Sequence, residues 1–107
     1  MTPSRLDTFR AMVAKSPGNA LARFGLANEA LKAKLYHEAE EHLRVYLGSH
    51  DDEGNGFGRH AEALAALGKT SDAAAALRLG MEAAYRFGHP GLANELRDRL
   101  EELEESA

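Results

Sequence analysis

The sequence predicts an all-helical fold on two observations, its composition and the regular spacing of its helix-breaking residues. Of the 107 residues, 20 are Ala and 15 are Leu, whereas two are Val and none is Ile. Ala, Leu, Glu, Arg and Lys are the strongest helix formers, and strands favour the β-branched residues that are scarce here. Gly, Pro and Asn divide the chain into about six helical stretches with short linkers. Short linkers join antiparallel neighbours, so we expect stacked helical hairpins.

The first two predicted helices are defined by their capping residues. A helix over 4–15 is expected because Ser4 and Asp7 have the spacing of a capping box. The Ser-Pro-Gly-Asn segment that follows ends this helix, and Asn19 is expected to cap a second helix over 20–34. The apolar stripe of the first helix consists of Leu6, Phe9 and Val13.

The third and fourth predicted helices are separated by a glycine-rich and acidic linker. We expect the third over 37–47, ended by Gly48 as a C-terminal glycine. The fourth is expected over 52–67, with the acidic residues of 51–53 capping its positive end. Glycine occupies every second position of 54–58, and each one costs about 1 kcal/mol relative to Ala in a helix. This helix should therefore fray at its start or begin late.

The last two predicted helices lie on either side of Gly88. The fifth is expected over 71–87, with Thr70 or Ser71 as its cap. Pro90 suits the first turn of a sixth helix over 90–105, which covers the last apolar face and has an acidic, solvated end. The apolar stripe of the sixth helix is Leu92, Leu96, Leu100 and Leu103.

An internal period of 34 residues relates the second and third helices to the fourth and fifth. Small and large residues recur at this step more clearly than identities do. A helix–turn–helix unit of 34 residues is the period of tetratricopeptide repeats. The pairs that keep the step are Ala27 with Ala61, Ala39 with Ala73, Leu43 with Leu77, and Arg44 with Arg78.

The segments 22–31, 36–47 and 58–70 carry a family resemblance. With their placement of alanines and leucines, the chain resembles the tetratricopeptide repeat family, in its small free-standing bacterial form. The resemblance implies a right-handed superhelical stack in a single domain. Its parts are a partial repeat at 4–15, repeats at 20–48 and 54–87, and a capping helix at 90–105, all within 1–107.

The resemblance also implies a function, because the first helices of such hairpins line a concave groove that binds peptides or proteins. Asn28 and Asn55 would bind main-chain amides, Phe24 would anchor an apolar group unless its neighbours bury it, and Arg59 would pair with an acidic group. The family's clamp for C-terminal carboxylates has a basic residue where Phe24 stands, so chaperone-tail binding is not expected. The groove positions are Leu21, Phe24, Asn28, Lys32, Asn55, Gly58, Arg59 and Glu62.

Self-assembly is the alternative function, and the protein would then be a structural module. Exposed ends of the stack, or Tyr85 and Phe87, would pair with a second copy. Residues 1–50 carry a formal charge of +2 and residues 51–107 carry −6, so head-to-tail contacts are electrostatically permitted. We therefore expect a monomer or a weak homo-oligomer.

Catalytic and metal chemistry have little support in the sequence. His37 lies four residues from Glu41, and His50 precedes the acidic 51–53, but neither group has a recognised zinc spacing or an obvious third ligand. The glycines of 54–58 follow no predicted strand and precede no lysine, which argues against a phosphate-binding loop. No serine lies on a strand-to-helix turn. We expect no enzyme activity, no cofactor and no metal.

Charge and hydropathy address the remaining classes. A net charge of −4 argues against nucleic-acid binding, which needs a basic surface. The chain has no cysteine, and no apolar run approaches the roughly 20 residues of a membrane span. No apolar signal segment follows the first residues, so the expected location is the cytoplasm, with a protein or peptide as partner and no membrane contact.

Overall fold

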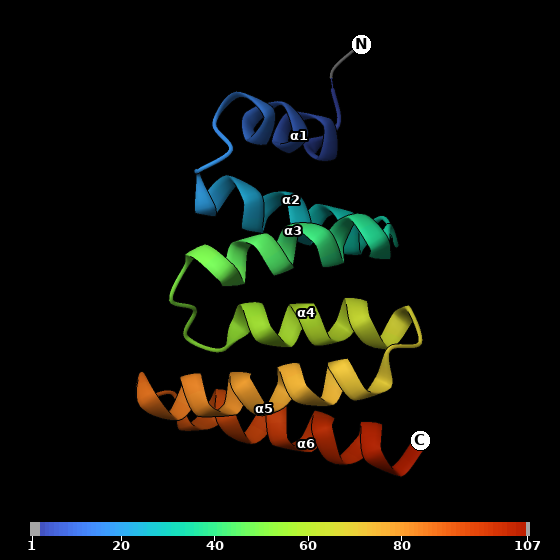
Figure 1. The fold of residues 1–107 in the computed structure, drawn as a ribbon, viewed down its shortest axis with the longest axis vertical. Coiled ribbons are helices and arrows are strands. Elements are labelled where there is room, and N and C mark those ends of the chain that lie inside the picture. Colours follow the sequence, from blue (N-terminus) through green and yellow to red (C-terminus); the bar gives the residue numbers. More distant parts are fainter. Residues whose placement is uncertain (1–2, 107) are drawn as a thin grey trace.

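A computed structural model describes residues 3–106, and in this range the chain forms six α-helices and no strand (Figure 1). The prediction of an all-helical protein is therefore confirmed for the described range; residues 1, 2 and 107 of the predicted domain lie outside it. The helices are α1 (Arg5–Lys15), α2 (Ala20–Lys32), α3 (Tyr36–Ser49), α4 (Asn55–Ala66), α5 (Thr70–Arg86) and α6 (Pro90–Ser106).

The helices are arranged in the order of the chain, with α1 at one end of the molecule and α6 at the other (Figure 1). The main contacts join sequential neighbours, and α2 also touches α4. The molecule measures 44 × 29 × 20 Å, with a radius of gyration of 14.1 Å. A globular domain of this length has a radius of gyration of about 13 Å, so the arrangement is somewhat elongated.

Alanines form the contacts between neighbouring helices. Ala27 and Ala39, between α2 and α3, are completely buried, and Ala61 and Ala73, between α4 and α5, are at most 2% exposed. Small side chains allow helix axes to approach closely, so the alanine-rich composition is used at the helix seams. Around them lie the large core residues Leu26, Leu43, Leu64, Leu77, Leu96 and Leu100.

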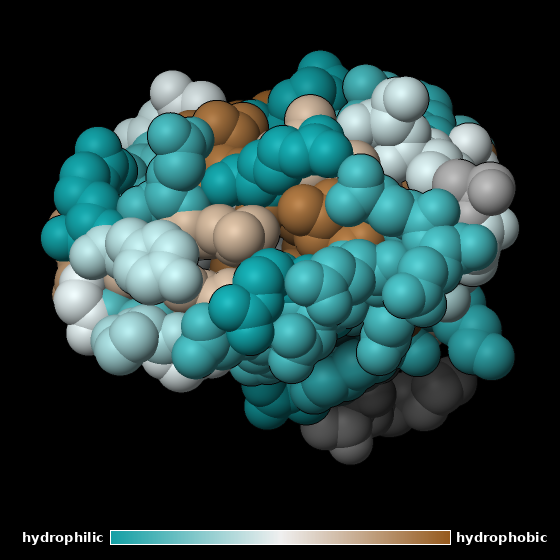
Figure 2. Space-filling view, turned by 90° about the horizontal axis from the view of Figure 1, so that it is seen from below, coloured by the Kyte–Doolittle hydropathy of each residue, from teal (hydrophilic) through white to brown (hydrophobic). Residues whose placement is uncertain are grey.

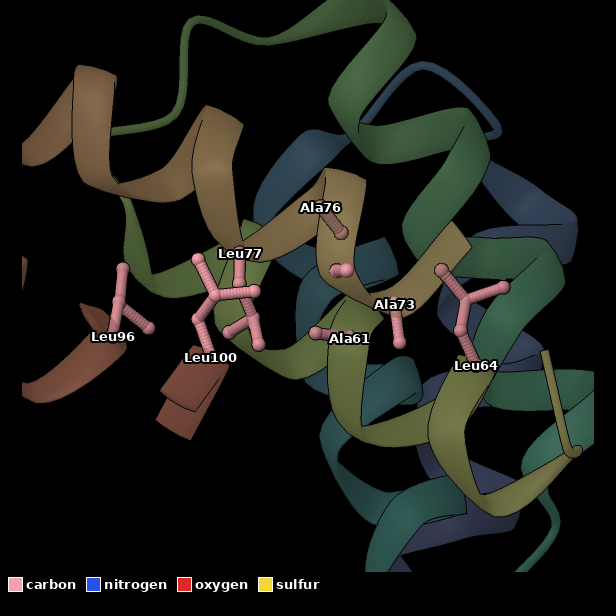
Figure 3. Packing of buried hydrophobic residues seen from close by; sticks show 8 residues of the cluster. Ala61, Leu64, Ala73, Ala76, Leu77, Leu96 and Leu100 are labelled. Atoms are coloured by element: carbon pink, nitrogen blue, oxygen red, sulfur yellow. The ribbon is translucent and has the colours of Figure 1, made fainter. Parts of the chain in front are cut away.

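Helix α6 covers the apolar side of α5 and one edge of α4. Leu96 and Leu100 pack against Ala61, Ala73 and Leu77 (Figure 3). Seen from the end at which α6 lies, the surface is mostly hydrophilic, with a narrower hydrophobic band between the polar margins (Figure 2). The polar residues therefore face solvent at this end, as expected for a helix that closes a stack.

The first two helix caps are as predicted. The side chain of Ser4 accepts a hydrogen bond of 3.1 Å from the backbone N–H of Asp7, and Asn19 accepts one of 3.0 Å from Ala22. Each bond satisfies a backbone donor that has no partner within its own helix.

Two other predicted helix ends are wrong. Gly48 does not end α3, which continues to Ser49 without a positive φ at the glycine. A glycine weakens a helix, but it ends one only where the chain takes the left-handed conformation. Neither Thr70 nor Ser71 caps α5, because the helix already begins at Thr70 and the residue before it, Lys69, makes no side-chain cap. The turn after α4 leads directly into α5 and leaves no capping position.

The turns that follow α2 and α4 share one geometry. Lys34 and Gly68 have φ values of +60° and +77°. In each turn the next residue donates a backbone hydrogen bond across the turn, from Leu35 to Ala30 (2.8 Å) and from Lys69 to Leu64 (2.9 Å). This is the pattern of a Schellman motif. The predicted second helix over 20–34 therefore ends at Lys32, because the positive φ two residues later turns the chain.

The start of α4 is built around the buried carboxylate of Asp52. Its Oδ2 atom accepts hydrogen bonds from the N–H groups of Gly54 (2.9 Å), Gly56 (2.8 Å) and Phe57 (3.3 Å). Its Oδ1 atom accepts one of 3.0 Å from the Tyr46 hydroxyl. The predicted acidic cap and late start are confirmed, since α4 begins at Asn55 rather than at residue 52. These donors already hold an internal carboxylate, which further argues against a phosphate-binding role for this loop.

Candidate functional site

A depression between α2 and α4 brings together half of the predicted groove residues. It has a volume of about 270 Å³. Four of the eight predicted positions line it, and Leu31, which the sequence interpretation placed on the packing surface of the second helix, adds an apolar wall. The lining residues are Asn28, Leu31, Lys32, Arg59 and Glu62.

Asn28 places an unsatisfied acceptor at this depression. Its side-chain oxygen Oδ1 is buried, yet no described residue donates a hydrogen bond to it. A buried polar atom without a partner costs about 1–3 kcal/mol, so most such atoms in folded proteins are paired. The geometry supplies what a binding site needs for an N–H group from outside the chain.

Two cations lie at the same depression in weak ion pairs. Lys32 Nζ is 3.5 Å from Glu29 Oε1, and the lysine side chain is 72% exposed. Glu29 is already engaged by Arg5 at 2.7 Å, and this hydrogen bond holds the pKa of the Glu29 carboxyl below its usual value. Arg59 Nη1 is 3.8 Å from Glu62 Oε1, with both side chains close to half exposed. Exposed pairs of this kind stabilise little, so both cations are available to an anionic ligand.

The other four predicted groove residues lie elsewhere. Leu21 is 81% exposed, and Phe24 is partly buried with its ring edge against Tyr46, 4.9 Å between ring centroids. Asn55 lines a different hollow. Gly58 is buried, and a Cβ atom there would come within 3.0 Å of side-chain atoms of α6. Gly58 and Phe24 therefore serve packing, so the predicted groove is shorter than the sequence interpretation made it.

A second hollow continues the depression toward α6. It has a volume of about 260 Å³ and shares Glu62 with the first. Arg99 of α6 lines it and donates a hydrogen bond of 2.9 Å to the carbonyl of Gly58. Sequence reasoning missed Arg99 and Glu102 because it treated α6 as a cap alone. Arg99 lies three residues after the buried Leu96, and this spacing is the signal that places it on the side facing α4.

Histidines pair with neighbouring helices rather than with each other. His60 Nε2 is 2.9 Å from Glu40 Oε2, joining α4 to α3, and His42 Nδ1 is 3.0 Å from the Arg23 guanidinium, joining α3 to α2. Burial, followed by the Arg23 charge, lowers the pKa of His42. Among residues 3–106 no three His, Asp or Glu side chains converge as a metal site would require. His37 remains exposed on the polar side of α3.

The described helices include none with the length and apolar character needed to cross a membrane. Comparisons of the chain with protein families, with curated proteins and with solved structures found no match in any of the three. The functional argument therefore depends on the site itself.

Proposed function

We propose that this chain is a helical-repeat module of the tetratricopeptide type, without catalytic activity, that binds an extended segment of a partner protein. The binding site is the depression between α2 and α4, continued toward α6. The ligand offers a main-chain N–H group to Asn28 and an acidic side chain to Lys32 or Arg59.

The turn geometry supports the repeat assignment. Lys34 and Gly68 are 34 residues apart, and so are the atoms that close the two turns, at Leu35 with Lys69 and at Ala30 with Leu64. A lysine in the left-handed region is uncommon, because that conformation is unfavourable for residues with a Cβ atom. The structure therefore repeats at a position where the residue type does not, and the alanine seams repeat at the same step.

The arrangement of the helices supports an open stack. Contacts run mainly between neighbours in the chain, and α2 touches α4, which is the contact expected between the first helices of successive hairpins. A stack of this kind leaves one side of its first helices uncovered. The depression lined by Asn28 and Arg59 lies on that side.

The unsatisfied Asn28 oxygen is the observation that carries the proposed site. A side-chain amide can both accept from a peptide N–H and donate to a peptide carbonyl, so it suits an extended main chain. Lys32 and Arg59 approach from the two helices that form the walls. In a protein with a net charge of −4, two weakly paired cations at one depression favour a ligand with an acidic side chain.

The test uses short peptides of random sequence, displayed on phage and selected on the wild-type chain. Calorimetry with a selected peptide should show that Asn28→Ala weakens binding by about tenfold or more, the equivalent of one buried hydrogen bond. The matched control is Asn94→Ala, which removes an exposed amide on α6 and should bind as the wild type does.

The charge arm of the test uses a second matched pair. Arg59→Ala should weaken peptides that contain Asp or Glu and should leave their Asn or Gln counterparts unaffected. Arg97→Ala removes an exposed arginine from α6, outside both hollows, and should change neither. If Asn28→Ala and Arg59→Ala both bind the selected peptides like the wild type, the binding site is not in this depression.

A further inference from the structure

One face of α5 carries an exposed leucine between two hollows. Leu79 is 50% exposed, although it is a large apolar residue in the middle of a 17-residue helix. A hollow of about 590 Å³ lies toward α3, and another of about 500 Å³ lies toward the C-terminal end of α5. Both are lined by Leu79 and Phe57. We call this surface the α5 face, defined by Asp72, Ala75, Ala76, Leu79, Glu82, Ala83 and Arg86.

We propose that the α5 face binds a second copy of this chain, with the two α5 helices antiparallel across a two-fold axis near Leu79. An isologous contact of this kind requires a surface that complements itself. A projecting leucine beside a hollow meets this requirement, because each Leu79 can fill a hollow of the other copy. The alanines at 75, 76 and 83 allow the two helices to approach closely.

The order of charges along α5 selects the antiparallel orientation. Asp72 lies seven residues before Leu79, and Arg86 lies seven residues after it. Seven residues are about two helical turns, or roughly 10 Å along the axis, so all three share one side of the helix. An antiparallel pairing places Asp72 opposite the partner's Arg86, twice by symmetry. A parallel pairing would place like charges opposite each other.

The existing partner of Arg86 does not block this contact. Arg86 Nη2 is 2.8 Å from Asp51 Oδ1, but the two side chains are 64% and 72% exposed. An exposed pair of this kind stabilises by about 0–1 kcal/mol and exchanges readily. Asp72 has no ion-pair partner within 4.0 Å among the described residues, so its carboxylate is available at the other end of the face.

The dimer would leave the proposed peptide site open. Phe57 and His60 line the hollows beside α5, whereas Arg59 and Glu62 line the depression shared with α2. These pairs lie on opposite sides of α4, since the hollows and the depression have no lining residue in common. A dimer through α5 therefore presents two peptide sites, and a ligand with two binding segments would gain avidity.

Disulfide trapping tests the contact cleanly because the chain has no cysteine. Leu79→Cys lies next to the proposed axis, so each copy should link to the same residue of the other under mild oxidation. Leu21→Cys is the control, since this leucine is 81% exposed on α2 and should link far more slowly. Equal rates for the two variants would overturn the proposal.

Charge exchange supplies the second measurement, by sedimentation equilibrium over a wide range of protein concentration. The wild type should dimerise, and Asp72→Arg or Arg86→Asp alone should raise the dimer dissociation constant by about tenfold or more, because each creates two repulsive pairs. The double exchange restores opposite charges and should restore the dimer. A wild type that stays monomeric at the highest concentration, or single variants that dimerise like it, would overturn the proposal without affecting the peptide site.

Discussion

The hydroxyl of Tyr46 and the carboxylate of Asp52 form a buried hydrogen bond of 3.0 Å that ties the last turns of α3 to the first turn of α4. Asp52 is only 5% exposed. Burial, together with this bond, raises the pKa of Tyr46 well above its usual value, so the hydroxyl remains a donor. The pair sets how the first hairpin meets the second, and thus where α4 lies relative to α2.

Replacing Asp52 should loosen this junction. Asp52→Ala leaves the Tyr46 hydroxyl and the N–H groups of Gly54 and Gly56 without their acceptor, and we expect it to lower the free energy of unfolding by about 3 kcal/mol. Asp51→Ala removes the neighbouring, exposed carboxylate and should cost under about 1 kcal/mol. Urea unfolding measures both, and equal losses would contradict the assigned role of Asp52.

Two helical glycines should respond in opposite directions to substitution by alanine. A Cβ atom at Gly80 would lie 2.9 Å from Leu96 and 3.0 Å from Phe57, where α4, α5 and α6 meet. Gly80→Ala should therefore destabilise by about 1–3 kcal/mol despite its better helix propensity. Gly48 in α3 has nothing within 4 Å, so Gly48→Ala should stabilise by about 0.5–1 kcal/mol. Thermal unfolding of the pair decides, and stabilisation by both would show that α6 does not pack closely on α5.

The proposed binding role of Asn28 has a consequence for stability. Alanine is the better helix former, and Asn28→Ala also removes a buried oxygen that has no partner in the chain. We expect the variant to unfold about 1 kcal/mol less readily than the wild type while it loses peptide affinity. A destabilised Asn28→Ala variant would mean that the amide has a structural role instead.

His42 should make stability depend on pH in a defined window. Its folded-state pKa lies below the ordinary value of 6.5, because burial and the Arg23 guanidinium disfavour the charged ring. As the pH falls through 6.5, the unfolded chain binds a proton that the folded chain does not, so stability decreases between about pH 7.5 and 5.5.

Two histidine variants provide the check for this pH dependence. His42→Gln should flatten the stability curve in that window, whereas His37→Gln, at an exposed position of the same helix, should keep the slope. The carboxyl groups of Glu29, Glu38 and Glu40 have lowered pKa values and so lose their stabilising ionised form only below about pH 4.5. Equal slopes for the two variants would contradict the assignment to His42.

Local sequence signals predicted most of the fold. Ser4 and Asn19 were predictable as caps because capping is decided by a few adjacent residues, and the late start of α4 followed from its alternating glycines. The end of α2 was not predictable, because it turns at Lys34, a residue that gives no turn signal. Gly48 misled for the opposite reason, since a turn-forming residue lies within a helix that tertiary packing continues past it.

The candidate site was only partly predictable because it depends on which side of α4 each residue occupies. Asn28, Lys32, Arg59 and Glu62 come together as the period of 34 residues implies. Gly58 does not, because α6 packs against its backbone, and this contact depends on a helix that does not keep the period. The missing partner of the Asn28 oxygen is a three-dimensional property that no residue pattern contains.

The most direct measurement of the central claim is an NMR titration of the ¹⁵N-labelled chain with a peptide selected on the wild type. We predict that the side-chain amide of Asn28 and the backbone amides of residues 28–32 and 59–62 shift together as the peptide saturates. Saturable shifts that are confined to α3 and α5, with the Asn28 amide unmoved, would place the ligand on the other side of α4 and contradict the proposed site.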